Sequence, residues 1–367
     1  MLGRGASDAS SPGVRILCID GGSVRGLATL QALRSLERAA GRPIAELFDL
    51  IVGTSIGGYL SVCLGVRRMS IDECEAALWS TRRSMEAAQG NGIFSGARRV
   101  ALGTAFDGKV HAESIVATLG PTARMDEVAS SPKVALVATC IDRNPAKPFL
   151  FRTYSLSGGS SGSSSFEGTC ATTQLEAARA TTAAPTFFPP VEIGGRVFVD
   201  GACIANNPAT IALAEAAALW PDAHVEAMVS VGTGLQSDAA HPGTSMVDWV
   251  AFQLNMSMDC TLAHSIAAAV LGRGRYWRFN FPSVGDVVLN ETRIPVIEEL
   301  VAKAKAHMET PQMRQDVADA AAALCGRSAS TPERAASPAA AGPGAEASPA
   351  GTPASEASPP SSPVSPV

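Results

Sequence analysis

Short apolar runs alternate along the chain with longer segments in which apolar residues recur at helical spacing. The runs at 14–19, 47–52 and 133–139 are short and rich in aliphatic residues, which predicts buried strands. Between the first two runs, four leucines recur every three residues, at positions 27, 30, 33 and 36. This spacing predicts a helix with one apolar face, which Gly41 and Pro43 would end.

The alternation continues as far as about residue 232. A helix is predicted at 56–65, and further strands are predicted at 148–154, 196–200 and 225–232. Strands that alternate with helices in this way are typical of an α/β sandwich with a mainly parallel sheet.

The two ends of the chain differ in composition from the region between them. Residues 1–13 are small and polar, and residues 327–367 are mostly Ser, Pro and Ala. Such a segment has too little apolar surface to offset the entropy lost on ordering it. We therefore expect a flexible N-terminus at 1–13, one globular domain at 14–326 and a disordered tail at 327–367. A flexible loop is expected inside the domain at 155–168.

Composition and charge exclude several classes of protein. Hydrophobic residues make up 46% of the 367 positions, which is enough to form a buried core. The net charge is −5, whereas a nucleic-acid-binding protein would carry an excess of basic residues. No apolar run reaches the roughly 18 residues of a transmembrane helix, and the N-terminus has no apolar signal segment. The eight cysteines form no CxxC pair, which favours a reducing compartment and a cytoplasmic location.

A serine stands between two glycines directly after the second predicted strand, in the sequence Gly53-Thr54-Ser55-Ile56-Gly57. A strand, a tight turn and a helix would place Ser55 at the apex of the turn, in a strained and exposed position. Strand and helix crowd each other there, so small residues are needed where Gly53 and Gly57 stand. Taken alone, the motif is equally compatible with a glycine-lined turn that carries a solvent-facing serine.

A second glycine-rich turn, DGGSVRG at 20–26, also lies between a predicted strand and a predicted helix. Gly21 and Gly22 could leave their backbone amides free to donate to an oxyanion, which is the largest electrostatic contribution in acyl transfer. A phosphate-binding loop is the alternative. A dinucleotide fingerprint would need a glycine where Ser23 stands, and no GxxxxGK[ST] sequence occurs, so a nucleotide site fits poorly.

Serine is a weak nucleophile without a base, so a proton acceptor is needed elsewhere in the chain. None of the five histidines lies at a convincing strand end; they are His111, His224, His241, His264 and His307. A carboxylate is better placed, because a two-glycine hairpin turn precedes the strand at 196–200, which ends in Asp200 followed by Gly201. An aspartate before a glycine is common in ordinary turns. Together with Ser55 and the glycine loop, however, Asp200 indicates a two-residue dyad.

These three pieces, in this order and spacing, resemble the patatin-like phospholipase family. That family carries a DGGGxRG loop, a GxSxG elbow and a later DGA or DGG, which correspond here to 20–26, 53–57 and 200–202. The likeness runs from about Val14 to roughly residue 240. Three flanking segments are also similar to the family, at 178–190, 205–208 and 230–234.

The resemblance implies a three-layer α/β/α fold and metal-free, cofactor-free hydrolysis of lipid acyl esters. It assigns Ser55 as the nucleophile, Asp200 as the base and the amides of Gly21 and Gly22 as oxyanion donors. Ser23 departs from the family's third glycine, and its amide could still donate if its backbone adopts the loop geometry. The supporting positions of the three motifs are Asp20, Arg25, Gly26, Gly53, Gly57 and Gly201.

Two other functions stay open. In an acyltransferase, another alcohol would replace water at the acyl-serine, and the elbow does not distinguish the two reactions. A non-catalytic lipid-binding regulator could keep the fold, although both members of the dyad are present. No EF-hand, HExxH or cysteine cluster predicts a metal site. The expected partner is a lipid at a membrane or droplet surface; the segments 27–41 and 246–258 are candidate contacts, although core packing is the simpler interpretation of both.

Overall fold

The structure, a computed structural model, describes residues 13–89, 106, 108–128, 132–156, 164–235, 256–282, 287–289 and 291–326. The tail expected at 327–367 lies outside these residues, as does all but the last residue of the N-terminal segment expected at 1–13. His241 and the segment 246–255 lie outside them too. In the described part of the chain, no helix combines the length and the apolar character that crossing a membrane requires.

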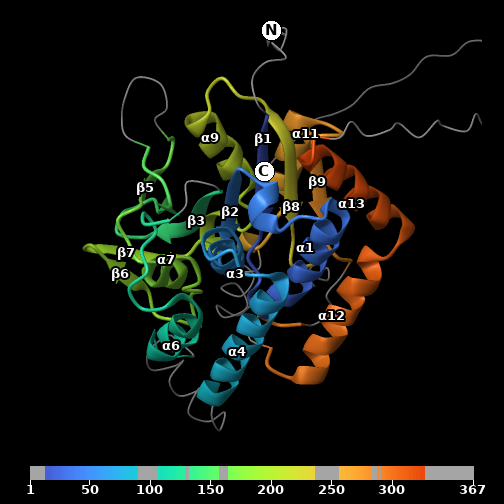
Figure 1. The fold of residues 1–367 in the computed structure, drawn as a ribbon. Helices are drawn as coiled ribbons and strands as arrows, with labels where there is room; N and C mark the ends of the chain where they lie inside the picture. Colours follow the sequence, from blue (N-terminus) through green and yellow to red (C-terminus); the bar gives the residue numbers. More distant parts are fainter. Residues whose placement is uncertain are drawn as a thin grey trace, which may run out of the picture. The chain divides into compact units, whose positions relative to one another are not determined.

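The described strands form one mixed sheet. They are β1 (Val14–Ile19), β2 (Leu50–Thr54), β3 (Lys133–Cys140), β4 (Lys147–Arg152), β5 (Glu167–Thr169), β6 (Val191–Ile193), β7 (Arg196–Asp200), β8 (Val225–Val231) and β9 (Tyr276–Phe279). The main path has the order β5-β4-β3-β2-β1-β8-β9 (Figure 1). Neighbours from β3 to β9 along this path are parallel, whereas β4 is antiparallel to β3. The predicted hairpin forms from β6 and β7 and joins the sheet through β3.

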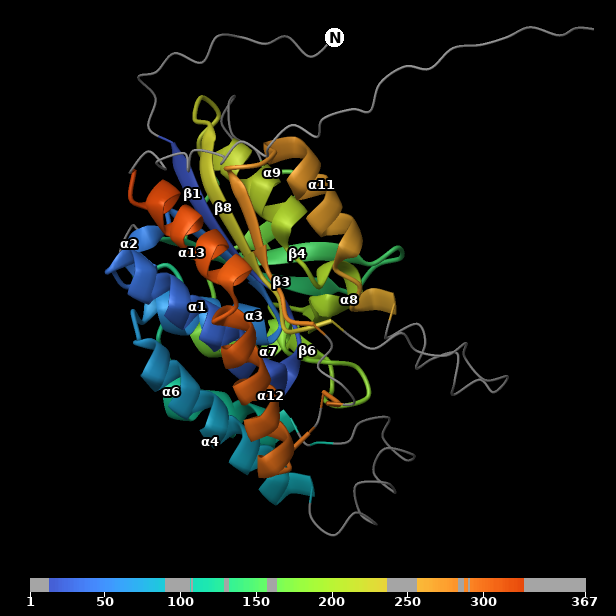
Figure 2. The ribbon, with the colours of Figure 1, turned by 90° about the vertical axis from the view of Figure 1, so that its right-hand side faces the viewer.

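Helices cover both faces of the sheet, which confirms the three-layer prediction. One apolar core involves α1 (Gly26–Ala40), α2 (Ile44–Leu47), α3 (Ile56–Ser61), α4 (Ile71–Gln89), α6 (Gly108–Leu119), α7 (Gln174–Thr181), α12 (Ile294–Met308) and α13 (Pro311–Leu324). The other involves α9 (Ala209–Leu219) and α11 (Thr261–Leu271). Figure 2 shows α1 and α13 on one side of β1 and β8, with α9 and α11 on the other.

Helix α1 is the helix that the leucine spacing predicts. All four of its leucines are fully buried, and α1 packs against α12 and α13. The apolar face of the segment 27–41 therefore belongs to the core, because no apolar stripe of α1 is left to contact a membrane.

Two predicted boundaries are wrong. The strand expected at 47–52 begins only at Leu50, because Ile44–Leu47 forms the short helix α2. The loop expected at 155–168 is shorter than predicted, because β5 begins at Glu167 and pairs with the edge of β4. In both cases the contact with a neighbouring element overrides a local pattern that favours another conformation.

Strand β3 aligns the ends of two strands that are distant in sequence. Its residue Val137 pairs with Thr54, the last residue of β2. The next residue of β3, Ala138, pairs with Asp200, the last residue of β7. Since β2 runs parallel to β3 and β7 runs antiparallel to it, the carboxyl ends of β2 and β7 meet on the same edge of β3. This register places Ser55, directly after β2, beside Asp200.

Candidate active site

The serine elbow forms as its motif predicts. Ser55 occupies the turn between β2 and α3 with φ = 55°, a left-handed conformation that is strained for a residue with a side chain. A Cβ atom on Gly57 would lie 2.2 Å from the carbonyl oxygen of Ile19, and one on Gly53 would lie 2.2 Å from that of Gly57. Both motif glycines are therefore required by close backbone contacts.

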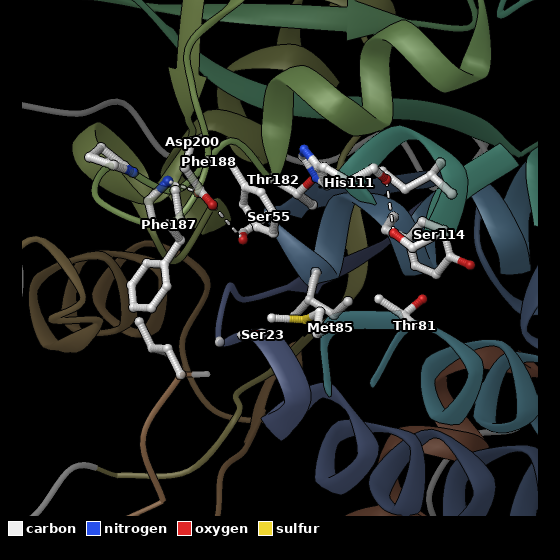
Figure 3. Close-up of a pocket in the computed structure, with 18 of the residues that line it drawn as sticks. Ser23, Ser55, Thr81, Met85, His111, Ser114, Thr182, Phe187, Phe188 and Asp200 are labelled. Carbon is white, nitrogen blue, oxygen red and sulfur yellow. Dashed lines mark hydrogen bonds between the residues drawn. The ribbon is translucent and has the colours of Figure 1, made fainter. Parts of the chain in front are cut away.

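Ser55 and Asp200 are in direct contact. The Ser55 hydroxyl donates to Oδ2 of Asp200 at 2.7 Å (Figure 3), and the backbone amide of Ala202 donates to Oδ1 at 2.8 Å. The serine was expected to be exposed at the turn apex, but only 8% of its surface is accessible. The reason is that α4, α6 and the segment 184–188 supply further walls around it, so that Ser55 and Asp200 line a pocket.

Thr181 on α7 fixes the backbone of the elbow. Its hydroxyl accepts from the Ser55 amide at 2.9 Å and donates to the carbonyl oxygen of Val137 at 2.5 Å. The amide of the serine is thereby satisfied, and the elbow is tied to β3, the strand that also positions Asp200. Sequence reasoning included Thr181 only in a family-like segment and assigned it no role.

The Asp200 carboxyl has an altered acidity. Its burial raises the pKa to about 7, against the opposing effect of the hydrogen bonds from Ala202 and Ser55. A carboxylate with an ordinary pKa of about 3.9 is a weak base. A value near 7 makes it a stronger proton acceptor and still leaves a large ionised fraction at neutral pH.

The pKa of Asp200 predicts how the rate of ester cleavage depends on pH. We expect kcat/KM for a short-chain ester to rise with pH and to reach half of its plateau near pH 7. At lower pH the carboxyl already holds a proton, so it cannot accept another from Ser55, and the rate should fall about tenfold per pH unit. A pH–rate profile between about pH 5 and pH 9 measures this. A flat profile over that range would argue against a base with the environment of Asp200.

In the glycine loop, Gly21 differs from the expectation that its amide is free to donate to an oxyanion. The amide of Gly21 donates to the carbonyl oxygen of Asn206 at 3.2 Å, so it is already occupied. Gly22 and Ser23 instead line the pocket together with Ser55. A Cβ atom on Gly22 would lie 2.2 Å from Oγ1 of Thr233, so a larger residue does not fit there. Ser23 adopts φ = 54°, a strained conformation that a glycine would adopt more easily.

A buried ion pair supports the start of the glycine loop. Nη1 of Arg278, on β9, donates to Oδ1 of Asp20 at 2.9 Å and to the Ser230 hydroxyl at 2.8 Å. The side chains of Arg278 and Asp20 are only 10% and 1% exposed. Arg25, also in the loop, donates from Nε to the carbonyl oxygen of Gly22 at 3.3 Å, and burial lowers the pKa of Arg25 to about 10. Sequence reasoning missed Arg278, which belongs to none of the three motifs.

His111 lines the same pocket but is not bonded to the serine. Its Nε2 lies 2.7 Å from the Thr182 hydroxyl, and its ring stacks on Phe188 with centroids 4.0 Å apart. Burial, and secondarily the charge of Arg179, lowers the pKa of His111 to about 3, so the ring is neutral at physiological pH. None of the four described histidines forms a hydrogen bond with Ser55; they are His111, His224, His264 and His307.

The walls of the pocket are mainly apolar. Phe187 and Phe188, in the family-like segment 178–190, contribute to it. Helices α4 and α6 contribute Met85 and Ile115, which lie far from the three motifs in sequence. An apolar cavity that contains a serine–carboxylate pair suits an uncharged, extended substituent beside a polar reacting group.

The fold and the site together define an α/β protein with a serine at a tight strand–helix turn, hydrogen-bonded to a carboxylate. A model of the family described as patatin-like phospholipase matches residues 17–213, which is more than half of the chain. The chain therefore belongs to the patatin-like phospholipase family.

Two curated proteins and one solved structure illustrate the similarity. Calcium-independent phospholipase A2-gamma from Homo sapiens is 33% identical over 316 residues, which are 82% of this chain and 39% of that protein. Phospholipase A I from Arabidopsis thaliana is 33% identical over 278 residues, which are 60% of this chain and 21% of that protein. The structure of human GIVD cytosolic phospholipase A2 aligns with a TM-score of 0.46 at 10% identity, over 85% of this chain and 60% of that chain. This chain thus spans well under half of the length of the two curated relatives.

Proposed function

We propose that the chain is a lipid acyl hydrolase that cleaves fatty-acyl esters of phospholipids or other glycerolipids. The observation that carries the proposal is the 2.7 Å hydrogen bond from the Ser55 hydroxyl to Asp200 in the lining of an apolar pocket. The names of the relatives, which are phospholipases, support the same substrate class. The presence of both dyad members favours an enzyme over a non-catalytic lipid-binding regulator.

In the first half of the proposed reaction, Oγ of Ser55 attacks the ester carbonyl carbon while Asp200 accepts the hydroxyl proton. The negative charge that develops on the carbonyl oxygen would be met by the backbone amides of Gly22 and Ser23, which line the pocket beside Ser55. When the carbonyl re-forms, the bond to the alcohol breaks. Asp200 returns the proton to the departing alcohol, and the acyl group stays on Ser55.

In the second half, Asp200 removes a proton from a water molecule that attacks the acyl-serine. The bond between the acyl carbon and Oγ breaks, Ser55 recovers its proton, and a fatty acid leaves. If an alcohol attacked the acyl-serine in place of water, the acyl group would be transferred to that alcohol, and the protein would act as an acyltransferase. Product analysis in the presence of a competing alcohol distinguishes these two outcomes.

The experiment that tests the proposed function is a hydrolysis assay over phospholipids, galactolipids and triacylglycerols. We expect the wild-type protein to release free fatty acid from at least one class, and Ser55→Ala to release none. The absence of release from every class by a folded wild-type protein would contradict the proposal.

We also propose that the reaction needs no metal ion. No group of three or more His, Cys, Asp or Glu side chains in the described ranges could hold one, and the names of relatives include calcium-independent phospholipases. A chelator is therefore expected to leave the hydrolysis of a soluble short-chain ester within about twofold of its rate without chelator. Loss of activity with chelator and its return on adding calcium would show that the dyad mechanism is incomplete.

We place the chain in the cytoplasm, in peripheral contact with a membrane or lipid droplet. The eight cysteines are all free, which suits a reducing compartment. The lipid substrate supplies the reason for contact with a membrane or droplet.

A further inference from the structure

Helix α11 has large apolar side chains on its outer face. Leu262, Ile266 and Val270 recur every four residues and are 71%, 42% and 61% exposed. The opposite face buries only Ala267 and Leu271 in the core shared with α9. A surface helix normally presents polar residues to water, so this apolar stripe indicates a surface that contacts something else. Figure 2 shows α11 on the outer side of its layer.

The same surface has positive charge at one end. The sequence from Cys260 to Arg275 contains no acidic residue, and Arg273 and Arg275 directly follow the helix. Within the described ranges, neither arginine has an acidic partner; Nε of Arg275 donates to the carbonyl oxygen of Leu271. Asp259 lies at the other end of the helix, where its carboxylate accepts from the Thr261 amide.

The outer face of α11 is continuous along the chain with the lining of the pocket. Ser257 and Met258 line the pocket, and Met256 beside them is 57% exposed. Asn206 ties this segment to the active site, because its Nδ2 donates to the carbonyl oxygen of Met258 at 3.1 Å. The carbonyl oxygen of Asn206 in turn accepts from Gly21 in the glycine loop. Anything that contacts the outer face of α11 would therefore also lie close to one rim of the pocket.

We propose that Met256 and the outer face of α11 dock onto an anionic lipid bilayer. The inference rests on the proposed function, since a bilayer is where a lipid acyl hydrolase meets its substrate. Helices that lie in the membrane interface combine an apolar face with adjacent basic residues, as α11 does. The negative headgroups of such a bilayer would pair with Arg273 and Arg275, which have no acidic partner among the described residues. Docking would bring the pocket rim at Met258 to the lipid surface.

The test measures binding to vesicles in a Ser55→Ala background, so that hydrolysis does not alter the vesicles. Ser55→Ala is expected to cosediment with vesicles of phosphatidylcholine and phosphatidylserine. Adding Leu262→Glu and Val270→Glu should weaken this binding at least about tenfold, because the apolar contact is replaced by buried charge. Adding Arg273→Gln and Arg275→Gln instead should weaken binding to the mixed vesicles, remove most of its salt dependence, and leave binding to pure phosphatidylcholine unchanged.

Ile141→Glu is the matched control, because Ile141 is another exposed apolar residue and lies outside this surface. It should bind vesicles as Ser55→Ala alone does, and thermal unfolding checks that every variant is folded. Equal binding by the folded Leu262→Glu, Val270→Glu variant would overturn the proposal. Self-association that these two substitutions abolish would also overturn it, because the face would then join two copies of the chain.

Hydrolysis of a water-soluble short-chain ester by the wild-type protein separates this inference from the proposed function. That substrate does not require a bilayer, so its cleavage reports on the dyad alone. A wild-type protein that cleaves the ester and whose Ser55→Ala variant binds no vesicles would refute only the docking surface. A protein that binds vesicles through α11 and cleaves no ester would refute only the hydrolase.

Discussion

Replacing Ser55 with alanine is expected to lower kcat/KM for a short-chain ester by at least about 10³-fold, and Asp200→Asn by a similar factor. Alanine lacks the oxygen that attacks the carbonyl, whereas asparagine keeps the shape of the aspartate but cannot accept the proton. The double variant should be about as inactive as either single variant, because each substitution removes the same step. Steady-state kinetics on the three variants measures this non-additivity.

His224→Gln serves as a control for these kinetics, since His224 pairs with Glu226 and lies away from the pocket lining. It should retain near-wild-type turnover. Near-normal turnover in Asp200→Asn, combined with loss of activity in His111→Asn, would contradict the dyad. The base would then be a histidine, and only the assignment of Ser55 would stand.

Arg278→Met is expected to lower the free energy of unfolding by about 3–5 kcal/mol. The substitution leaves the Asp20 carboxylate buried without the cation that neutralises it. Adding Asp20→Asn to Arg278→Met should recover part of the loss, because the stranded charge is then removed. Urea unfolding of the two single variants and the double variant measures the coupling between Asp20 and Arg278.

Arg314→Met provides the matched control for this cycle. Arg314 forms an ion pair with Glu309 at 2.7 Å, but its side chain is 67% exposed. Loss of this exposed ion pair should lower the free energy of unfolding by no more than about 1 kcal/mol. If Arg278→Met and Arg314→Met lowered the free energy of unfolding equally, burial would not be the reason that the ion pair of Asp20 and Arg278 stabilises the fold. Reduced ester cleavage by Arg278→Met under conditions where it is folded would further link the ion pair to the glycine loop.

The turns that carry the candidate chemistry were predictable because the residues that mark each turn are adjacent in the chain. Gly53 makes its close contact with Gly57 in the same turn, Gly57 makes its own with Ile19 on β1, and a two-glycine hairpin leads into the strand that ends at Asp200. Helix α1 was predictable for the same reason, because its four leucines lie close together in the chain and all face the core. The position of Asp200 at a strand end, taken with the two earlier motifs, indicated its pairing with Ser55, and the resemblance to one family assigned the same pair. The register of β3 provides its physical cause.

The remaining features depend on contacts between distant parts of the chain. The pair of Asp20 and Arg278 joins residues 258 positions apart. Asp20 begins the glycine-rich motif, but no local pattern marks Arg278 as its partner. The amide of Gly21 is occupied only because the segment after Asp200 returns to it through Asn206. The outer face of α11 could not be recognised either, because an apolar helix in a sequence reads as core until its neighbours are known.

Labelling with a fluorophosphonate, followed by peptide mass mapping, tests the central claim most directly. The reagent loses fluoride as it phosphonylates an activated serine, so its rate reports the nucleophile and its base without any lipid. We predict a single adduct on Ser55 in the wild-type protein, no adduct at that position in Ser55→Ala, and labelling of Ser55 at least about 10²-fold slower in Asp200→Asn. An adduct on another serine, or equally fast labelling of Ser55 in Asp200→Asn, would contradict the account.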